Sequence, residues 1–219
     1  MKAMILAAGR GERMRPLTDT LPKPLLEVHG KPLIMHHLEN LSKSGFKDVI
    51  INIAHLGYKI PEALGDGSRW GLNITYSDEQ KSGALESLGG IVKALPLLGD
   101  ETFLVVNGDI FCDYEFESDF DLGDKMAHLI LVPNPPHNEK GDFGLEGSLV
   151  CNKSDDMVTF SGIGYYNPKI FKNLQPIKAL LAPLLRKMIE KQEISGELYR
   201  GIWHDIGTPQ RLQKINENF

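Results

Sequence analysis

The chain has few cysteines and lacks any long apolar run, and both features narrow its class. Its 219 residues include only two cysteines, Cys112 and Cys151. Their spacing matches no zinc-binding motif, and so few thiols favour free cysteines in a reducing compartment over a disulfide framework. No stretch approaches the roughly 18 consecutive apolar residues that a transmembrane helix needs. We therefore expect a cytoplasmic protein with no membrane partner.

The chain also has fewer basic residues than acidic residues. Lys and Arg number 24 against 29 Asp and Glu, and the formal net charge is −5. Because broad attraction to nucleic acid requires a basic surface, this balance argues against a nucleic-acid partner. Any anionic ligand must instead be held by a local group of cations. The length and the ordinary hydrophobic content of 42% suit one globular domain, expected over residues 1–219.

Apolar strands and helical patterns alternate through the first half of the chain. We expect strands over 3–8, 48–53, 72–77 and 103–107, with helices over 33–44, 58–64 and 87–95 between them. The run at 103–107 is almost wholly apolar, which is typical of a strand buried on both faces of a parallel sheet. This order predicts the α/β class, with a doubly wound, mostly parallel, Rossmann-like sheet.

The second half is less regular. Strands are expected over 128–132, 149–151, 159–166 and 199–206, and helices over 180–189 and 209–216. The stretch 133–147 is rich in Pro, Asn and Gly, and it predicts a long loop or hairpin over the site. Since no repeat or linker interrupts the chain, a single domain is expected.

A glycine loop with clustered cations follows the first strand. Arg10 lies between Gly9 and Gly11, and two more arginines follow at 13 and 15. Glycines let backbone N–H groups approach phosphate oxygens, and arginines neutralise their charge. The dinucleotide fingerprint would need a glycine where the chain has Met14, and no Gly-Lys-Ser/Thr follows. The loop therefore predicts a nucleoside triphosphate site of neither the dehydrogenase nor the Walker type.

Two further segments carry charges suited to the same ligand. Lys23 stands between Pro22 and Pro24, whose rings stiffen the backbone around a single point charge. Asp109 follows the buried strand 103–107, and the carboxyl ends of parallel strands are where such sheets bind ligands. Asp205, taken alone, fits the cap of the helix expected near Pro209.

From Leu6 to Leu25 the chain resembles the sugar-1-phosphate nucleotidyltransferases. The shared pattern is Leu-Ala-Ala-Gly-x-Gly-x-Arg-x-x-Pro-Leu-Thr-x-x-x-Pro-Lys-Pro-Leu. These enzymes join a sugar 1-phosphate to a nucleoside triphosphate and release pyrophosphate. The resemblance implies their GT-A-like fold without the C-terminal left-handed β-helix of larger relatives. It also implies a nucleotide-binding half over 1–110 and a sugar-phosphate-binding half over 111–219.

The resemblance assigns roles to individual residues. It implies that Arg13, Lys23 and Asp109 are catalytic, and that Asp109 and Asp205 bind Mg²⁺. The implied nucleotide-binding residues are Ala8, Gly9, Gly11, Glu12, Arg13, Lys23, Ser87 and Asn107. The implied sugar-binding residues are Asp142, Ser161, Gly162, Arg200 and Trp203.

Further segments resemble one branch of the family, the N-acetylmuramate-1-phosphate uridylyltransferases of peptidoglycan recycling. They include 65–69, 94–100 and 195–203. This branch implies UTP and N-acetylmuramate 1-phosphate as substrates. Mannose 1-phosphate with GTP and glucose 1-phosphate with dTTP remain alternatives, as does an inactive nucleotide-sugar-binding regulator. The oligomeric state, monomer or dimer, stays open.

One segment departs from the family pattern. Relatives carry Glu-Thr-Gly-Gly-Gly against the base, whereas this chain has Glu-Ser-Leu-Gly-Gly over 86–90. A leucine at 88 is expected to keep the backbone from approaching the base in the same way. The identity of the base therefore depends on how this segment is placed.

Overall fold

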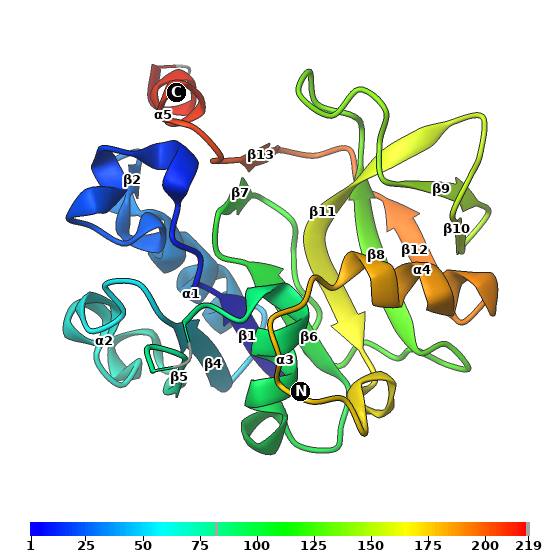
Figure 1. Ribbon diagram of the computed structural model, residues 1–219, viewed down its shortest axis with the longest axis horizontal. Coiled ribbons are helices and arrows are strands. Elements are labelled where there is room, and N and C mark those ends of the chain that lie inside the picture. The colour runs from blue at the N-terminus through cyan, green and yellow to red at the C-terminus, as the bar shows by residue number, and fades with distance from the viewer. Residues whose placement is uncertain (82, 218–219) are drawn as a thin grey trace.

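One mixed sheet forms the centre of the protein (Figure 1). The computed structural model describes residues 1–81 and 83–217, and within them nine strands pair in the order β5-β4-β1-β6-β11-β8-β12-β10-β9. Their bounds are β1 Lys2–Leu6, β4 Asp48–Ile53, β5 Asn73–Asp78, β6 Phe103–Asn107, β8 Ala127–Val132, β9 Phe143–Glu146, β10 Leu149–Cys151, β11 Met157–Tyr166 and β12 Ile194–Leu198.

Helices and short strand pairs surround this sheet. The helices are α1 Leu33–Lys43, α2 Lys59–Leu64, α3 Glu86–Leu98, α4 Ala182–Glu190 and α5 Pro209–Glu217. Separate two-stranded pairs join β2 (Glu27–Val28) to β3 (Lys31–Pro32) and β7 (Ile110–Cys112) to β13 (Trp203–Asp205). Single 3₁₀ turns are η1 Glu12–Met14, η2 Leu17–Asp19, η3 Lys23–Leu25, η4 Ser68–Trp70 and η5 Pro168–Phe171.

Each face of the sheet is covered because successive residues of β1 point to opposite sides. Ala3 and Ile5 belong to the core cluster that includes residues of α1 and α2. Met4 belongs to the cluster that includes residues of α3 and α4. Figure 1 shows α3 and α4 in front of the sheet. The predicted doubly wound α/β class is therefore confirmed.

Parallel pairing is concentrated in the first half of the chain. The strands β5, β4, β1 and β6 are all parallel, and β8 pairs parallel with β12. The strand β11 instead runs antiparallel to both β6 and β8, and β10 runs antiparallel to β12 and β9. The second half thus extends a parallel sheet with largely antiparallel strands.

The expected strand over 199–206 is correct only for residues 203–205, which form β13 and pair with β7. The strand of the main sheet, β12, lies before this stretch and ends at Leu198. The chain leaves the sheet between them, where Tyr199 donates its hydroxyl to Asp113. The stretch 133–147 is a loop over 133–142 that leads into β9, and β9 forms an antiparallel hairpin with β10, which lies just beyond the stretch.

The winding of the sheet fixes where a ligand can bind. The chain proceeds from β1 to β4 and β5 on one side, and then returns to place β6 on the other side of β1. Leu6 at the end of β1 is the register partner of Asn107 at the end of β6. The carboxyl ends of such neighbours, where the strand order reverses, leave a crevice for a ligand.

No helix in 1–81 or 83–217 has both the length and the apolar character needed to cross a membrane. Both cysteines are free thiols. Burial raises the pKa of the Cys112 thiol to about 11, so it stays protonated at neutral pH.

A buried histidine beneath the site makes stability depend on pH. His37 in α1 bonds to the backbone of Ile110, and burial lowers its pKa from 6.5 to about 4. The unfolded chain therefore binds a proton on His37 at a higher pH than the folded chain does. The free energy of unfolding should fall as the pH drops from about 6.5 to about 4.

We predict that His37→Gln, which retains a hydrogen-bond donor but cannot be charged, removes about 2 kcal/mol of the stability change between pH 7 and pH 5. Urea denaturation of both proteins at the two pH values measures this difference. An equal pH dependence in the two proteins would show that His37 is not responsible.

Candidate active site

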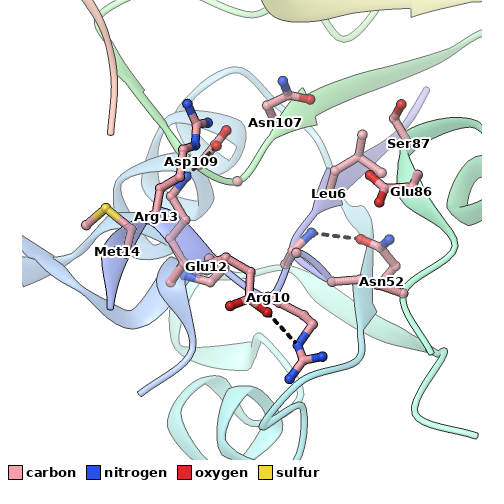
Figure 2. Close-up of a pocket in the computed structure, with 18 of the residues that line it drawn as sticks. Leu6, Arg10, Glu12, Arg13, Met14, Asn52, Glu86, Ser87, Asn107 and Asp109 are labelled. Atoms are coloured by element: carbon pink, nitrogen blue, oxygen red, sulfur yellow. Dashed lines mark hydrogen bonds and ion pairs between the residues drawn. The ribbon is translucent and has the colours of Figure 1, made fainter. Parts of the chain in front are cut away.

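A cavity of about 820 Å³ opens at the carboxyl ends of β1 and β6 (Figure 2). All the residues expected to bind the nucleotide line it, together with Asp109, Asn52, Lys178 and Gly207. In Figure 2, Arg13 and Glu12 lie on one side, Glu86 and Ser87 on the opposite side, and Asn107 and Asp109 along the top. The fold thus gathers four separate segments around one space.

The glycine loop is shaped by Gly11. Its φ is +66°, a conformation that favours glycine, and a Cβ there would lie 2.8 Å from Thr18 Cγ2. The hydroxyl of Thr18 donates to the Gly11 carbonyl at 2.8 Å, and Met14 N–H donates to the same carbonyl. These bonds bend the chain so that 8–13 lines the cavity. Arg10 is paired with Glu12 at 3.2 Å, whereas Arg15 pairs with Asp19 outside the cavity.

Lys23 and Asp109 form an ion pair in the wall of the cavity. Lys23 Nζ lies 2.6 Å from Asp109 Oδ2. The lysine side chain is 10% exposed, and that of the aspartate is 39% exposed. The stiff backbone at Pro22 and Pro24 therefore holds a largely buried charge against an accessible carboxylate.

The backbone at Asp205 lies beside the backbone at Asp109, but the Asp205 side chain lines a different cavity. Ile206 N–H donates to the Asp109 carbonyl at 2.7 Å, which joins the two segments. The Asp205 carboxylate bonds to Arg211 and lies 2.8 Å from His137 Nε2. It lines a second cavity of about 580 Å³ that also includes Trp203.

The donor chemistry of this pair suits a hard cation. Carboxylate oxygens are the ligands that Mg²⁺ prefers, although Asp109 lines the first cavity and Asp205 lines the second. In the part of the chain that the structure describes, no group of three or more His, Cys, Asp or Glu side chains forms a metal cage. A magnesium ion bound here would therefore need oxygens from the substrate or from water.

The expected sugar residues Ser161, Gly162 and Trp203 lie together next to Asn107. Pairing of β11 with β8 shifts between Phe160 and Ile163, which marks a bulge. Gly162 there has a φ of +84°, and a Cβ on it would lie 2.4 Å from Asn107 Nδ2. Trp203 Nε1 donates to the Ser161 carbonyl at 2.9 Å. Residues expected to bind the sugar are thus in direct contact with Asn107, which is expected to bind the nucleotide.

Asp142 and Arg200 are placed apart from this group. The Asp142 carboxylate accepts from Phe160 N–H at 2.9 Å and from Asn138 Nδ2 at 3.2 Å. Arg200 is exposed in the turn after β12. Neither Asp142 nor Arg200 is among the described residues that line the two cavities.

The segment over 86–90 is held by a strap of chain, 173–181. Leu88 N–H donates to the Ala179 carbonyl at 2.9 Å, and Leu181 N–H donates to Ser87 Oγ at 2.9 Å. A Cβ on Gly89 would lie 2.2 Å from the Ile177 carbonyl oxygen. The Leu88 side chain packs against the core under α3 and α4 and is not among the described residues that line the cavity.

Sequence reasoning missed several residues of the site. Asn52 stands at the end of an apolar strand, and Glu79 directly follows β5, so an amide and a carboxylate at strand ends were the available signals. Lys178 reaches the nucleotide cavity from the strap, and Arg211 reaches Asp205 from α5. No local pattern indicates either of these two.

Comparison with known families gives one clear match. The model of the nucleotidyl transferase family matches residues 2–147, which include the glycine loop, Lys23 and Asp109.

Curated relatives extend this match over the whole chain. An N-acetylmuramate alpha-1-phosphate uridylyltransferase from Neisseria meningitidis is 51% identical over 98% of this chain and 96% of its own length. A UTP–glucose-1-phosphate uridylyltransferase from Synechocystis is 40% identical over 73% of this chain. The chain spans only 43% of that relative, and 62% of a mannose-1-phosphate guanylyltransferase catalytic subunit beta from Danio rerio that is 28% identical.

A solved structure confirms the fold. A Bacillus anthracis protein described as a putative glucose-1-phosphate thymidylyltransferase superposes with a TM-score of 0.83. The superposition covers 99% of this chain and 94% of that one at 23% sequence identity.

The close approach of Gly162 to Asn107 predicts that a methyl group added at position 162 lowers stability. We expect Gly162→Ala to lower the free energy of unfolding by about 1–3 kcal/mol, because it adds backbone strain and a clash with Asn107. Nucleoside triphosphate affinity should fall as well, since Asn107 must move. Thermal denaturation and calorimetric titration measure the two effects.

Gly147→Ala is the matched control. Gly147 has a φ of +61°, but a Cβ added there would meet no heavy atom within 4 Å, so this variant adds strain without a clash. Equal losses of ligand affinity in both variants would contradict the proposed contact effect.

Proposed function

Because the chain belongs to the nucleotidyl transferase family, we propose that it transfers uridine monophosphate from UTP to N-acetylmuramate 1-phosphate and releases pyrophosphate. The observation that carries the reaction is the convergence of Arg13, Lys23 and Asp109 on one cavity. The choice of base and sugar rests on the nearly full-length similarity to the Neisseria relative.

Residues 1–110 form the nucleotide-binding half of this proposal, and residues 111–219 form the sugar-phosphate-binding half. The glycine loop and Ser87 lie in the first half, while Ser161, Gly162 and Trp203 lie in the second. Their contact at Asn107 supports an acceptor bound beside the triphosphate. Asp142 and Arg200 remain proposed sugar contacts from the surrounding loops.

The reaction is an in-line displacement at the α-phosphorus. A non-bridging oxygen of the sugar 1-phosphate forms the new P–O bond, and the bond to the β-phosphate breaks with its electron pair leaving on pyrophosphate. The second pKa of a phosphate monoester is about 6, so the attacking oxygen is already ionised near neutral pH. The site therefore needs no general base, and its task is to position two anions and stabilise charge.

Each charged residue has one task in this scheme. Backbone amides near Gly9 and Gly11 bind the triphosphate, and Arg13 stabilises the charge that develops on pyrophosphate. Lys23, fixed in the buried wall, lies between the α-phosphate and the incoming phosphate. Asp109 and Asp205 would hold Mg²⁺, which supplies positive charge to the triphosphate oxygens when bound.

The proposed cellular role is the recycling of peptidoglycan in the cytoplasm. A uridylylated N-acetylmuramate is a cell-wall precursor, and both proposed substrates are small, charged molecules that do not cross membranes freely. This cellular role depends on the identity of the acceptor, so a preference for another sugar 1-phosphate would rule it out.

Substrate identity can be measured directly. We predict that pyrophosphate release is fastest with UTP and N-acetylmuramate 1-phosphate in a grid of five nucleotides and several sugar 1-phosphates. Maximal release with GTP and mannose 1-phosphate, or with dTTP and glucose 1-phosphate, would replace the proposed substrates. Binding of nucleotide without turnover on any pair would identify a regulator instead of an enzyme.

The ion pair in the wall of the cavity gives a second prediction. Asp109→Asn should lower kcat by at least about a hundredfold, since each 1.36 kcal/mol of lost stabilisation costs tenfold. Asparagine can still accept a bond from Lys23, so the fold should persist. Pyrophosphate release and a thermal melting curve test both statements.

Asp121→Asn provides the control for this change. Asp121 is an exposed residue that accepts a bond from Gly123 N–H outside the cavity. It should retain normal turnover. Near-normal turnover in Asp109→Asn would contradict the catalytic assignment.

A further inference from the structure

A fully buried carboxylate lies behind the nucleotide cavity. Glu79, the residue after β5, is 0% exposed, and Asn52 at the end of β4 is 2% exposed. Asn52 Nδ2 donates to Glu79 Oε1 at 2.8 Å. Burial of a carboxylate costs free energy unless several donors bond to it, so the donors around Glu79 determine whether it can remain buried.

The two side chains connect both walls of the cavity. Asn52 Oδ1 accepts from Ala7 N–H at 2.7 Å, where the chain leaves β1 for the glycine loop. On the other side, Glu79 Oε2 accepts from Leu85 N–H at 2.8 Å, directly before α3 begins at Glu86. Figure 2 shows Asn52 bonded toward the loop on the same side of the cavity as Glu86.

The helix α3 is shaped to admit this connection. A Cβ on Gly90 would lie 2.7 Å from Asn52 Nδ2 and 2.9 Å from Glu79 Oε1. Any larger residue would push the helix away from the Asn52–Glu79 pair. The pair is therefore enclosed on three sides, by the loop entrance, by the start of α3 and by Gly90.

We propose that Glu79 is a positioning residue that, through Asn52, fixes the phosphate-binding loop and the base-side segment 83–87 at one separation. The inference rests on the proposed function, because it assumes that a nucleotide spans the cavity from Ala8 to Ser87. Correct spacing of these two walls lets one ligand contact both without deforming either. Loss of the carboxylate removes the acceptor of Leu85 N–H and frees the side chain of Asn52, which holds Ala7 N–H.

Two single variants break the connection in opposite ways. Glu79→Gln presents an amide N–H₂ to one of the donors, Asn52 Nδ2 or Leu85 N–H, so one bond is lost. Asn52→Asp places a second carboxylate against Glu79 in a buried site. We expect each to weaken UTP binding about tenfold or more, since a buried polar group loses its partner.

The double variant, Asn52→Asp with Glu79→Gln, should restore the connection with the charge moved to the other position. The new carboxylate at position 52 can accept from Ala7 N–H and from the new amide N–H₂ at position 79. The amide carbonyl at position 79 then accepts from Leu85 N–H. UTP affinity should return most of the way toward that of the unmodified protein. A purely structural role would change melting temperature without producing this recovery of affinity.

The experiment measures the Kd of UTP with MgCl₂ by calorimetry, the KM values of UTP and acceptor, and the melting temperature of each protein. The expected result is a raised Kd and KM for UTP in the single variants, an acceptor KM within about twofold of normal, and recovery in the double variant. Tyr165→Phe is the control, because it removes a part-buried hydroxyl that accepts from Glu117 N–H, on a strand separated from β4 by β1 and β6, and it should leave UTP affinity unchanged.

Distinct outcomes separate failure of the inference from failure of the proposed function. If the unmodified protein does not bind UTP, the proposed function fails. If it binds UTP but the single variants bind equally well, or the double variant binds no better than the weaker single variant, the positioning role is wrong. If neither single variant folds, the double variant decides, since near-normal affinity supports the role and a tenfold loss overturns it.

Discussion

The parallel pairing of β1 with β6 is the constraint on which the rest of the site depends. It sets Leu6 opposite Asn107, so the glycine loop and the Asn107–Asp109 turn leave the sheet side by side. Gly108 N–H donates to the Leu6 carbonyl at 2.9 Å, and a Cβ on Gly108 would lie only 2.7 Å from that oxygen. The loop that would bind phosphates and the aspartate that would bind a cation are thus neighbours through backbone geometry alone.

Each of the two aspartates at the site has a cationic partner, one distant in the sequence and one nearby. Asp109 is paired with Lys23 from the N-terminal loop, and Asp205 is paired with Arg211 from α5. Removing one member of a partly buried pair leaves the other uncompensated, which ties local folding to the charges that the chemistry requires. The two ion pairs therefore couple the local structure of the site to the charges that the proposed reaction uses.

Local patterns in the sequence predicted the parts of the site that depend on short segments. The glycine loop, Lys23 between prolines, and Asp109 after a buried strand each require only adjacent residues, and all line the same cavity. The expected strand over 199–206 was too long, because only 203–205 pair with β7, whereas the preceding strand β12 joins the main sheet, and these partners are distant in the sequence. Asn52, Glu79 and Lys178 were missed for the same reason.

The leucine at 88 was expected to affect the approach of the backbone to the base, but its side chain faces the core. Gly89 and Gly90 are required by close approach of the strap and of the Asn52–Glu79 pair, whereas the side chain at 88 packs into the core. A departure at that position therefore changes core packing rather than the described lining of the cavity. The two remaining glycines explain why this segment keeps its place although the third is absent.

The contact of Gly162 with Asn107 also constrains how such a chain can diverge. Position 162 has no room for a side chain while an asparagine occupies position 107 in its present place. A side chain at 162 therefore requires a change at 107 as well. A lineage that acquires a different acceptor through a side chain at 162 must alter both positions together, whereas one that changes only the surrounding loops leaves this pair intact.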